Sequence, residues 1–482
     1  MSQSKNDAPV LIISLLLTLG LLAAGGWWAY QLFSGKNSGV IPGATGNGPE
    51  TSPISKAVIN GGVTAVSRGE SILIASNQSP QKSAGVEAIA QQNYPVAIQQ
   101  FEQSLAANRN DPEALIYLNN SQIGGQAAYT IAVVVPSPAV TNIAEELLRG
   151  AAQSQRDINQ AGGINGVPLK VTIASDNDDP SQAKAVAQWL TEDPSILGVI
   201  GHFSSGISLA AIDIYQAKQM VMMSPTSTSV DLSNAGDYAF RTVQSDAVAA
   251  NSLAQYMLEQ AQLKQVAVFY NSESNYSKSL KGEFSNAILT KGGRVVSEFD
   301  VKALGFNASQ AVNEARERGA EAIMLATTAD TQGQALDVIA ANGRQLQLLG
   351  GDELYTAEVL KIAQANAVGM VVAVAWHRDG TPNAIFPKAA QSLWGGPVSW
   401  RTAMAYDASQ AFINAIEKTG LTPDVITPAA VQQALIDSSF SATGAADTVS
   451  FLFSGDRSLP PQLVVVRPGV ASGSGYDYAP LP

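Results

Sequence analysis

From residue 129 onward, short apolar runs typical of buried strands alternate with longer stretches that have helical periodicity. The predicted strands lie at residues 129–135, 169–174, 196–200, 220–223, 265–270, 293–299, 322–326, 347–350, 369–375, 449–453 and 462–467. The predicted helices lie at residues 143–160, 181–191 and 247–261, after residue 277, and at 399–419 and 428–438. Strands and helices in turn imply crossover connections and parallel sheets. Because the pattern starts afresh near residue 247, we expect an α/β fold of two lobes, each a mostly parallel sheet flanked by helices.

Two neighbouring strand ends within residues 197–229 carry small hydroxyl side chains. The first is followed by FSSG (203–206) and a helical pattern, and the second by PTST (225–228). The free N–H groups of a helix N-terminus favour an anion, and ligands of open parallel sheets bind at strand ends. Each turn alone is better explained by ordinary Ser and Thr caps. Two in succession favour a carboxylate-sized site.

Composition excludes several classes of protein. The 482-residue chain has a net charge of −12, which argues against nucleic-acid binding. It has no cysteine and only two histidines, His202 and His377, so thiolate and multi-histidine metal sites are excluded. The Asp-rich turn at 176–179 lacks the twelve-residue calcium loop with its terminal Glu. Nothing nominates either histidine for a serine triad. We therefore expect no metal, no cofactor and no enzymatic activity.

Residues 9–33 are uncharged and long enough to span a bilayer, with an aromatic cluster at Trp27, Trp28 and Tyr30. We expect an uncleaved membrane anchor, with a removed signal peptide as the alternative. Residues 34–84 are rich in Gly, Ser and Pro up to about residue 67 and predict a flexible linker, in which residues 70–75 (ESILIA) could form one short strand.

Residues 85–125 change to a helical pattern that is broken at Asn110, Asp111 and Pro112. The spacing of Tyr94, Ala97, Phe101, Pro112, Ala114 and Tyr117 resembles a tetratricopeptide repeat. Since only about one repeat is present and solenoids need roughly three, a helical hairpin that packs on the main body or spaces it from the membrane is a better expectation than a peptide-binding groove.

From residue 129 to about 469, the chain resembles the leucine/isoleucine/valine-binding branch of the class I periplasmic solute-binding proteins, the extracytoplasmic receptors of ABC importers. The matching motifs are AGGINGVPLKV (161–171), SDNDDP (175–180), VIGHFSSG (199–206), MSPTSTS (223–229), FRTVQSD (240–246), GGDEL (350–354), AYDASQA (405–411) and FSGDR (453–457). The resemblance implies two lobes joined by three crossovers, which close on a ligand in the cleft between them.

The resemblance also implies roles for individual residues. It places Ser205 and Thr228 on a ligand carboxylate, and Asp352 opposite a ligand ammonium. Tyr276 would close over the ligand from the second lobe. The remaining expected contacts are the backbone of Phe203 and Thr226, and Ser204, Ser227 and Thr328. Hydroxyls and helix-end amides suit a carboxylate, and a desolvated Asp favours a cation, so an amino acid or similar zwitterion is expected.

One departure affects the expected specificity. The family often has an aromatic residue after the strand at 322–326, where this chain has Thr327, Thr328 and Asp330. A second acidic group there suits a ligand larger or more polar than leucine, whereas a helix-capping role for Asp330 is the simpler explanation. Trp376 and Trp400 are candidates for lining the cleft or for ordinary packing.

The expected organisation has six parts: residues 1–33 as anchor or signal, 34–84 as linker, 85–125 as helical hairpin, 126–246 plus 376–447 as lobe 1, 247–375 plus 448–470 as lobe 2, and 471–482 as tail. We expect an extracytoplasmic receptor, tethered to the cytoplasmic membrane, that passes an amino acid to an ABC permease. The alternative is a membrane-tethered sensory or regulatory receptor that signals through a partner protein.

Overall fold

The computed structural model describes residues 58–59, 63–380, 385–445 and 447–481. The expected membrane anchor at 9–33 and most of the expected linker lie outside these residues. None of the described helices has the length and apolar character needed to cross a bilayer. The described part of the chain contains two large sheets, which we call the sheets of lobe 1 and lobe 2.

Lobe 1 is built on a six-stranded sheet in the order β3-β5-β4-β6-β7-β8. Its strands are β3 (Val66–Ser67), β4 (Tyr129–Val135), β5 (Leu169–Ser175), β6 (Ile196–Ile200), β7 (Met222–Ser224) and β8 (Ala239–Arg241). All neighbours pair in parallel except β3, which runs antiparallel to β5. The helices of this lobe are α5 (Thr141–Gln160), α6 (Pro180–Glu192), α7 (Ser205–Ala217), α14 (Trp400–Thr419) and α15 (Pro428–Ile436).

Helices cover both faces of this sheet, which explains why its central strand is apolar throughout. Every residue of β4 is buried. Ile131 and Val133 pack in one cluster with side chains of α5 and α14, whereas Ala132 and Val134 pack in another with side chains of α6 and α7. Alternate residues of a strand point to opposite faces, so a strand covered on both sides becomes a continuous apolar run.

Lobe 2 is built on a seven-stranded sheet in the order β10-β9-β11-β12-β13-β16-β17. Its strands are β9 (Gln265–Tyr270), β10 (Arg294–Asp300), β11 (Ala322–Ala326), β12 (Gln347–Gly350), β13 (Val371–Val374), β16 (Gln462–Pro468) and β17 (Tyr476–Pro480). The first five are parallel, and β16 and β17 are antiparallel. Its helices are α8 (Asp246–Gln255), α9 (Asn275–Thr290), α10 (Ala308–Glu317), α11 (Gln332–Asn342) and α12 (Ala357–Ala363), and α8 continues into one wider turn, η3 (Tyr256–Gln260).

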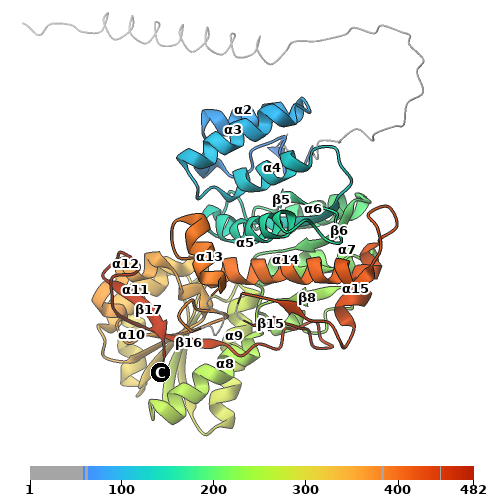
Figure 1. Ribbon diagram of the computed structural model, residues 1–482. Coiled ribbons are helices and arrows are strands. Elements are labelled where there is room, and N and C mark those ends of the chain that lie inside the picture. Colours follow the sequence, from blue (N-terminus) through green and yellow to red (C-terminus); the bar gives the residue numbers. More distant parts are fainter. Residues whose placement is uncertain (1–57, 60–62, 381–384, 446, 482) are drawn as a thin grey trace, which may run out of the picture. The chain divides into compact units, whose positions relative to one another are not determined.

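The chain passes between the two lobes three times. It leaves lobe 1 after β8, returns from β13 to α14, and leaves again between β15 (Thr448–Val449) and β16. Helix α13 (Ile385–Trp394) lies on the second passage, and the short pair β14 (Ala442–Thr443) and β15 lies before the third. Figure 1 shows this division, with α5, α14 and α15 on one side and α8 to α12 on the other. The mixed α/β fold with mainly parallel sheets confirms the expected fold class.

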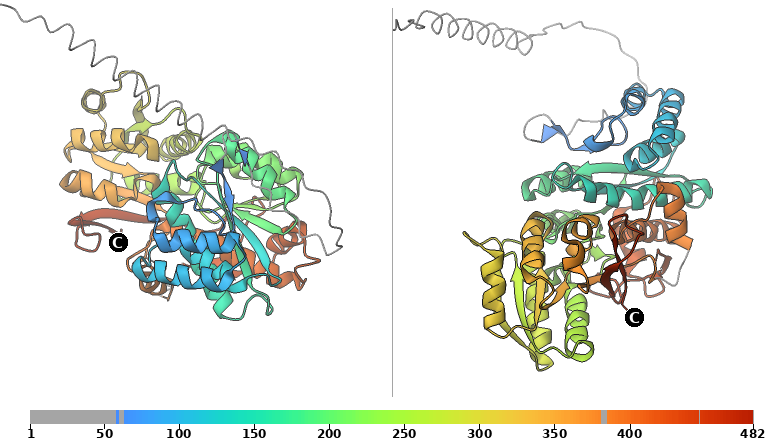
Figure 2. Two further views of the ribbon diagram at one scale, coloured as in Figure 1. Left: turned by 90° about the horizontal axis from the view of Figure 1, so that it is seen from above. Right: turned by 90° about the vertical axis from the view of Figure 1, so that its left-hand side faces the viewer.

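Three N-terminal helices form a layer on lobe 1: α2 (Pro80–Ala90), α3 (Tyr94–Ala107) and α4 (Pro112–Ile123). Each packs on the next, and α4 also packs on α5 and β5, as Figure 2 shows. The predicted helical character and the break at residues 110–112 are therefore confirmed, but the expected two-helix hairpin is wrong, because a further break between α2 and α3 makes three helices. Within the layer, the Lys82 ammonium is fully buried between Asp111 at 2.9 Å and Glu113 at 2.7 Å.

Two predicted strands are wrong. Residues 70–75 form no strand, because the N–H group of Leu73 donates a 2.6 Å hydrogen bond to the Glu113 carboxylate rather than to a neighbouring strand. The strand of this region is instead β3, where Val66 pairs with Ala174. The strand predicted at 449–453 is limited to β15. Residues 476–480, within the expected tail, form β17 at the edge of the lobe 2 sheet.

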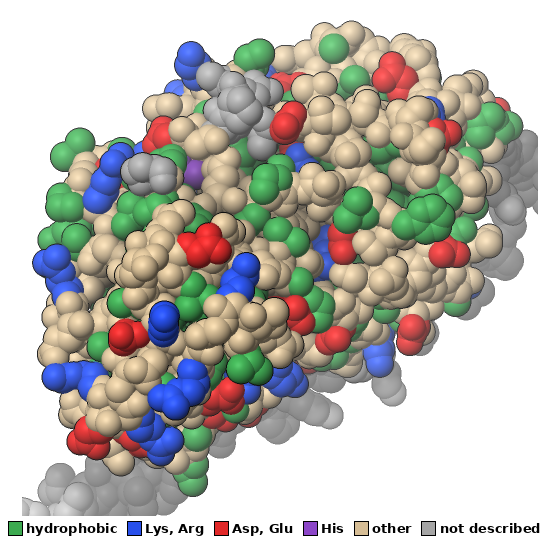
Figure 3. Space-filling view, turned by 90° about the horizontal axis from the view of Figure 1, so that it is seen from below, with side chains coloured by type: hydrophobic (Ala, Val, Ile, Leu, Met, Phe, Trp, Pro, Cys, Tyr) green, Lys and Arg blue, Asp and Glu red, His purple; other side chains and the backbone are tan. Residues whose placement is uncertain are grey.

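Short additional elements complete the described chain. They are β1 (Val58–Ile59) paired with β2 (Val63–Thr64), and the helical turns η1 (Ala75–Asn77), η2 (Val230–Leu232), η4 (Ala329–Thr331), η5 (Asp352–Leu354) and η6 (Gln364–Ala367). On the face drawn in Figure 3, apolar side chains are scattered among acidic, basic and polar ones. Of these elements, η2 and η5 matter for the site, because each follows the carboxyl end of a parallel strand.

Candidate ligand site between the two sheets

The lobe 1 part of the site is formed where β6 and β7 end side by side. Helix α7 begins at Ser205 after β6, and the turn after β7 carries Thr228. The Ser205 hydroxyl accepts a 3.2 Å hydrogen bond from the N–H group of Ser229, which ties the two turns together. Both Ser205 and Thr228 are buried. The structure thus brings together the two hydroxyls that the sequence assigned to a carboxylate, at the N-terminus of a 13-residue helix.

The other hydroxyls of these turns are hydrogen-bonded within the fold. The Phe203 carbonyl accepts hydrogen bonds from Thr226 at 2.7 Å and Ser227 at 3.1 Å. The Ser204 hydroxyl donates to Asp178 at 2.7 Å. In contrast, the buried Thr228 hydroxyl has no hydrogen-bond partner. Among these residues, Thr226, Ser227 and Ser204 therefore shape the turns, and Thr228 offers a free hydroxyl.

The lobe 2 part of the site joins α9 to the turn η5, which follows β12. The hydroxyl of Tyr276, in the first turn of α9, donates a 2.8 Å hydrogen bond to Oδ1 of Asp352, the first residue of η5. Both side chains are buried. Burial and the neighbouring Glu353 raise the pKa of Asp352 to about 7, although the Tyr276 hydrogen bond opposes the rise. A cation placed here would compensate the charge of this carboxylate.

A second buried carboxyl group, Asp246, lies close to the first two parts of the site. Its N–H group donates a 2.8 Å hydrogen bond to the Thr228 carbonyl. Burial raises the pKa of Asp246 to about 7, while the Ser279 hydroxyl lowers it, and Oδ2 has no hydrogen-bond partner. Asp246 also raises the pKa of Asp352 by charge repulsion. The two buried carboxyl groups therefore act on each other across the site.

Direct contacts join the two parts. The N–H group of Val230 in lobe 1 donates a 3.0 Å hydrogen bond to the Ser279 hydroxyl on α9. A Cβ atom added to Gly206 in the first turn of α7 would lie 3.3 Å from the Asn275 side-chain oxygen. Helices α7 and α9 pack together. The hydroxyl turns of lobe 1 thus face the Tyr276 side of lobe 2.

Thr328 forms its hydrogen bonds with other residues than the groups above. Its hydroxyl accepts a 2.9 Å hydrogen bond from Asn271 and donates to Asp330 at 2.5 Å. Asp330 forms a 2.8 Å ion pair with Lys302 and does not cap helix α11, whose N-cap is Thr331. Within the described part of the chain, no hydrogen bond links Thr328 to Ser205, Thr228, Tyr276 or Asp352. The helix-cap explanation for Asp330 is wrong, because its carboxylate is held by the Thr328 hydroxyl and the Lys302 ammonium.

The residues considered for metal or catalysis have structural partners. His202 is fully buried, with Nδ1 2.6 Å from Asp176 and Nε2 3.1 Å from the Tyr215 hydroxyl. Asp179 caps α6 through the N–H groups of Ser181 and Gln182. No cluster of three potential metal ligands occurs among the described residues. These contacts fix the loops after β5 and β6 that hold the site.

Three charged residues next to the site, Arg401, Glu146 and Glu353, were not predicted from the sequence. Arg401 lies at the start of α14, and its ion-pair partners are Glu146 on α5 and Glu353 beside Asp352. The motif GGDEL (350–354) contained Glu353, but only its Asp was assigned a role. A single arginine in the first turn of a helix carries no sequence signal of burial, so Arg401 required the tertiary structure.

Sequence comparison places these features in a known family. The profile described as "Periplasmic binding protein" matches residues 128–466. The Leu/Ile/Val-binding protein homolog 3 of Brucella melitensis is 31% identical over 342 residues, which are 69% of this chain and 90% of the relative. The Leu/Ile/Val-binding protein of Escherichia coli K12 is 29% identical over 286 residues, which are 58% of this chain and 77% of the relative.

Solved structures share the fold. An ABC transporter substrate-binding protein from Desulfitobacterium hafniense, in complex with Leu, is 24% identical, with a TM-score of 0.62 over 73% of this chain and 100% of the other. A leucine-binding protein from Thermotoga maritima is 20% identical, with a TM-score of 0.63 over 73% of this chain and 98% of the other. The tetratricopeptide resemblance of the N-terminal helices has no counterpart among these matches. The chain belongs to the periplasmic binding protein family of solute-binding proteins.

Proposed function

We propose that this protein is an extracytoplasmic receptor that captures an amino acid between its lobes and delivers it to an ABC permease. The names of its relatives, which bind leucine, isoleucine and valine, support this class of ligand. The observation that carries the proposal is the pairing of two opposite subsites. Hydroxyls and a helix N-terminus lie on lobe 1, and the Tyr276–Asp352 pair lies on lobe 2.

In this proposal each subsite binds one end of the zwitterion. Ser205, Thr228 and the N-terminal amides of α7 bind the α-carboxylate, and Asp352 binds the α-ammonium. Tyr276 orients Asp352 through its 2.8 Å hydrogen bond and closes over the ligand. The backbone of Phe203 and Thr226 lines the site. Ser204, Ser227 and Thr328 support it through their hydrogen bonds to Asp178, Phe203 and Asn271.

The mechanism is lobe closure without chemical change. The carboxylate subsite and the ammonium subsite lie on different lobes, so a zwitterion can satisfy both only when the lobes meet. A ligand shifts such an equilibrium by its difference in affinity for the two states. The contacts of Val230 with Ser279 and of α7 with α9 are available to stabilise the closed state.

The proposed lobes are residues 126–246 plus 376–447 and residues 247–375 plus 448–470. We further propose that residues 9–33 anchor the protein in the cytoplasmic membrane and that residues after 34 tether the receptor to it. The uncharged stretch at 9–33 supports an anchor, because about 20 apolar residues span a bilayer as a helix. An anchored receptor would remain near its permease.

A second candidate function is that of a sensory or regulatory receptor. The observation that favours it is the helical layer α2–α4, which precedes the residues matched by the family profile and packs on α5. In that role the tetratricopeptide-like layer would contact a partner protein. The ligand is captured in the same way in both functions. They differ in the protein that binds the closed receptor, which is an ABC permease in the first and a signalling partner in the second.

Calorimetric titration of the full chain in detergent with the twenty amino acids tests the proposal. We expect saturable binding of at least one amino acid, lost in Asp352→Asn and weakened in Thr228→Val. Asp337→Asn, an exposed aspartate on α11, serves as the matched control. Absence of binding by the folded chain to every amino acid would reject the amino-acid assignment.

A further inference from the structure

Arg401 is a buried cation at the junction of the two lobes. Its side chain is 2% exposed and lies 3.5 Å from Glu146 on α5 and 3.2 Å from Glu353 in η5. Its guanidinium group also lies over the Trp400 ring, 4.6 Å from the ring centre. A buried arginine is costly unless it is paired, so this position is built around the charge and is not a surface salt bridge.

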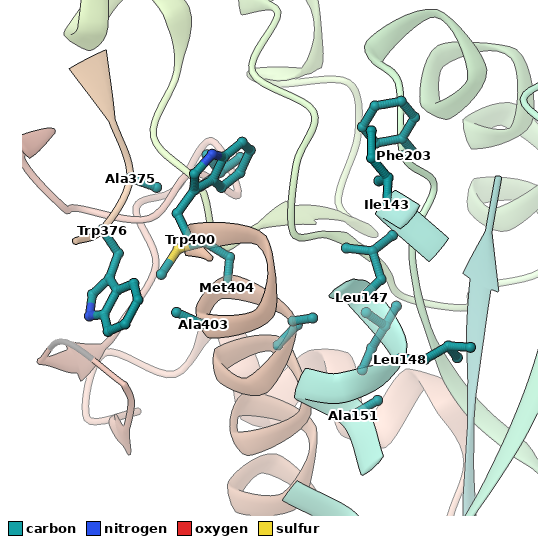
Figure 4. Packing of buried hydrophobic residues seen from close by; sticks show 14 of the residues in the cluster. Ile143, Leu147, Leu148, Ala151, Phe203, Ala375, Trp376, Trp400, Ala403 and Met404 are labelled. Carbon is teal, nitrogen blue, oxygen red and sulfur yellow. The ribbon is translucent and has the colours of Figure 1, made fainter. Parts of the chain in front are cut away.

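This group borders the proposed ammonium subsite. Glu353 follows Asp352 directly in η5. Burial alone would lower the pKa of Arg401, but Glu353, Glu146 and Asp352 together raise it above its ordinary value. Figure 4 shows Trp400 at the start of α14, with Phe203 and Ile143 of lobe 1 beyond it, and all three belong to one packed cluster. The group formed by Arg401, Glu146, Glu353 and Trp400 therefore lies next to the proposed ammonium subsite, and its Trp400 packs in one cluster with Phe203 of the proposed carboxylate side.

This group contains both buried donor atoms and a buried acceptor atom that form no hydrogen bond. Nε of Arg401 and the indole Nε1 of Trp400 are buried donors without a hydrogen-bond partner. Nη2 of Arg401 is engaged in the 3.2 Å ion pair with Glu353, whereas Oε2 of Glu146 lies 3.5 Å from Nη1 of Arg401 but accepts no hydrogen bond. An unsatisfied buried polar group costs about 1–3 kcal/mol. A ligand side chain that both accepts and donates hydrogen bonds would remove these costs.

Aliphatic, carboxylate, cationic and carboxamide side chains of a ligand would interact differently with this group. A branched aliphatic side chain satisfies none of these atoms. A carboxylate would accept from Arg401 but would be repelled by Glu146 and Glu353. A cation would donate to the two glutamates but would be repelled by Arg401. A neutral carboxamide accepts through its oxygen and donates through its NH2 group, so of these four classes it is the one that complements both the donors and the acceptor.

We propose that Arg401, Glu146, Glu353 and Trp400 form a specificity subsite for an amino acid whose side chain ends in a carboxamide, as in glutamine or asparagine. This inference rests on the proposed function, because the α-carboxylate and α-ammonium subsites must hold the ligand first. It differs from the names of the relatives, which specify aliphatic ligands.

Titration of the wild-type full chain with matched ligands tests the subsite without any mutation. Glutamine, glutamate, lysine and leucine share the α-groups and differ in the end of the side chain. We expect glutamine or asparagine to bind at least tenfold more tightly than glutamate, lysine or leucine, because sites built for hydrogen bonding reject analogues that lack the group. Tighter binding of leucine, glutamate or lysine would overturn the subsite and leave the proposed function intact.

Variants separate a specificity role from a structural one. Glu146→Gln keeps the size of the side chain and removes the charge that accepts from the amide NH2 group. We expect glutamine affinity to fall about tenfold, while the affinity for alanine, which lacks an amide, changes less than threefold. An equal loss for both ligands would overturn the specificity role. Arg149→Gln, which removes the partner of Glu145 on the same helix, is the control and should change neither affinity. If no amino acid binds the folded wild-type chain, the proposed function itself fails.

Discussion

The hydroxyl of Tyr276 lies 2.8 Å from Oδ1 of Asp352, and both side chains are buried. This hydrogen bond favours the ionised carboxylate of Asp352 against burial and the repulsion of Glu353. It also joins α9 to η5, so the proposed ammonium subsite would have a fixed geometry within lobe 2.

Removing this hydroxyl should weaken binding. In Tyr276→Phe, Asp352 loses a hydrogen bond to its charged form, which is worth about 1.5–3 kcal/mol. We expect amino-acid affinity to fall at least tenfold by calorimetry. Tyr129→Phe also loses one tyrosine hydrogen bond, to the Leu421 carbonyl at 2.7 Å, but lies at the start of β4 away from the site. It should bind normally, and an unchanged affinity in Tyr276→Phe would refute the role of this residue.

Ligand affinity should rise with pH through the range in which Asp352 ionises. Its pKa is about 7 before a cation arrives, and a bound ammonium favours the ionised form. Below pH 7 the carboxyl group must first release its proton, so affinity should fall by up to about tenfold per pH unit between pH 7 and pH 5. Titration over this range measures the slope. An affinity that does not change between pH 7 and pH 5 would contradict the prediction.

Asp246 should destabilise the ligand-free fold at neutral and higher pH. Its pKa is raised from 3.8 to about 7, so the native state holds this proton more tightly than the unfolded chain does. The stability conferred by the protonated group is complete below about pH 4 and is lost as pH rises to about 7. Asp246→Asn should therefore raise the melting temperature at pH 8 and lose this advantage near pH 4. Asp337→Asn should show no such trend. A lower melting temperature than wild type at pH 8 would contradict the prediction.

The fit of Gly351 beneath Tyr276 leaves no room for a side chain. A Cβ atom at this position would lie 2.2 Å from the Tyr276 hydroxyl and 2.6 Å from Cδ2 of Leu280. Gly351→Ala should displace Tyr276, reduce stability by about 1–3 kcal/mol and weaken ligand binding. Gly282→Ala on α9, where an added Cβ meets nothing within 4 Å, is the matched control. If the two variants had the same stability and the same ligand affinity, the side chains around Gly351 would have room to move and the prediction would be wrong.

The buried Lys82 should determine the stability of the helical layer without affecting the ligand site. Lys82→Met leaves Asp111 and Glu113 as buried, unpaired carboxylates, and breaking a buried pair in this way costs about 3–5 kcal/mol. We expect a lower midpoint in urea unfolding and unchanged amino-acid affinity in the folded protein. Lys184→Met, an exposed lysine on α6, should change neither. If fully folded Lys82→Met protein bound amino acids more weakly than wild type, the helical layer would be coupled to the ligand site and the prediction would be wrong.

The fold followed from the sequence because its signals are periodic and repeated. Strands such as β4 and β11 are buried on both faces and read as continuous apolar runs. The strand predicted at 70–75 does not form for a specific reason. The N–H groups of Leu73 and Ile74 donate to the Glu113 carboxylate, and no local sequence pattern reveals this contact. Helix α13 and strand β17 were also not predicted from the sequence.

Part of the candidate site could likewise be predicted from the sequence, and part could not. Ser205 and Thr228 follow adjacent parallel strands, so topology alone brings them together. Arg401 on α14 and Glu146 on α5 are 255 residues apart in the chain. They meet only because these two helices pack together. A pairing that depends on tertiary packing leaves no local signature, which is why the proposed specificity subsite required the structure.

In the proposed site, both charges of an amino acid are recognised, one on each lobe. Titration of the full chain with the tightest-binding amino acid, its decarboxylated amine and its deaminated acid tests this arrangement. We expect each single-charge analogue to bind at least a hundredfold more weakly, a difference of about 2.7 kcal/mol. Binding of either analogue with the affinity of the amino acid would contradict the assignment of Ser205 and Thr228 to the carboxylate or of Asp352 to the ammonium.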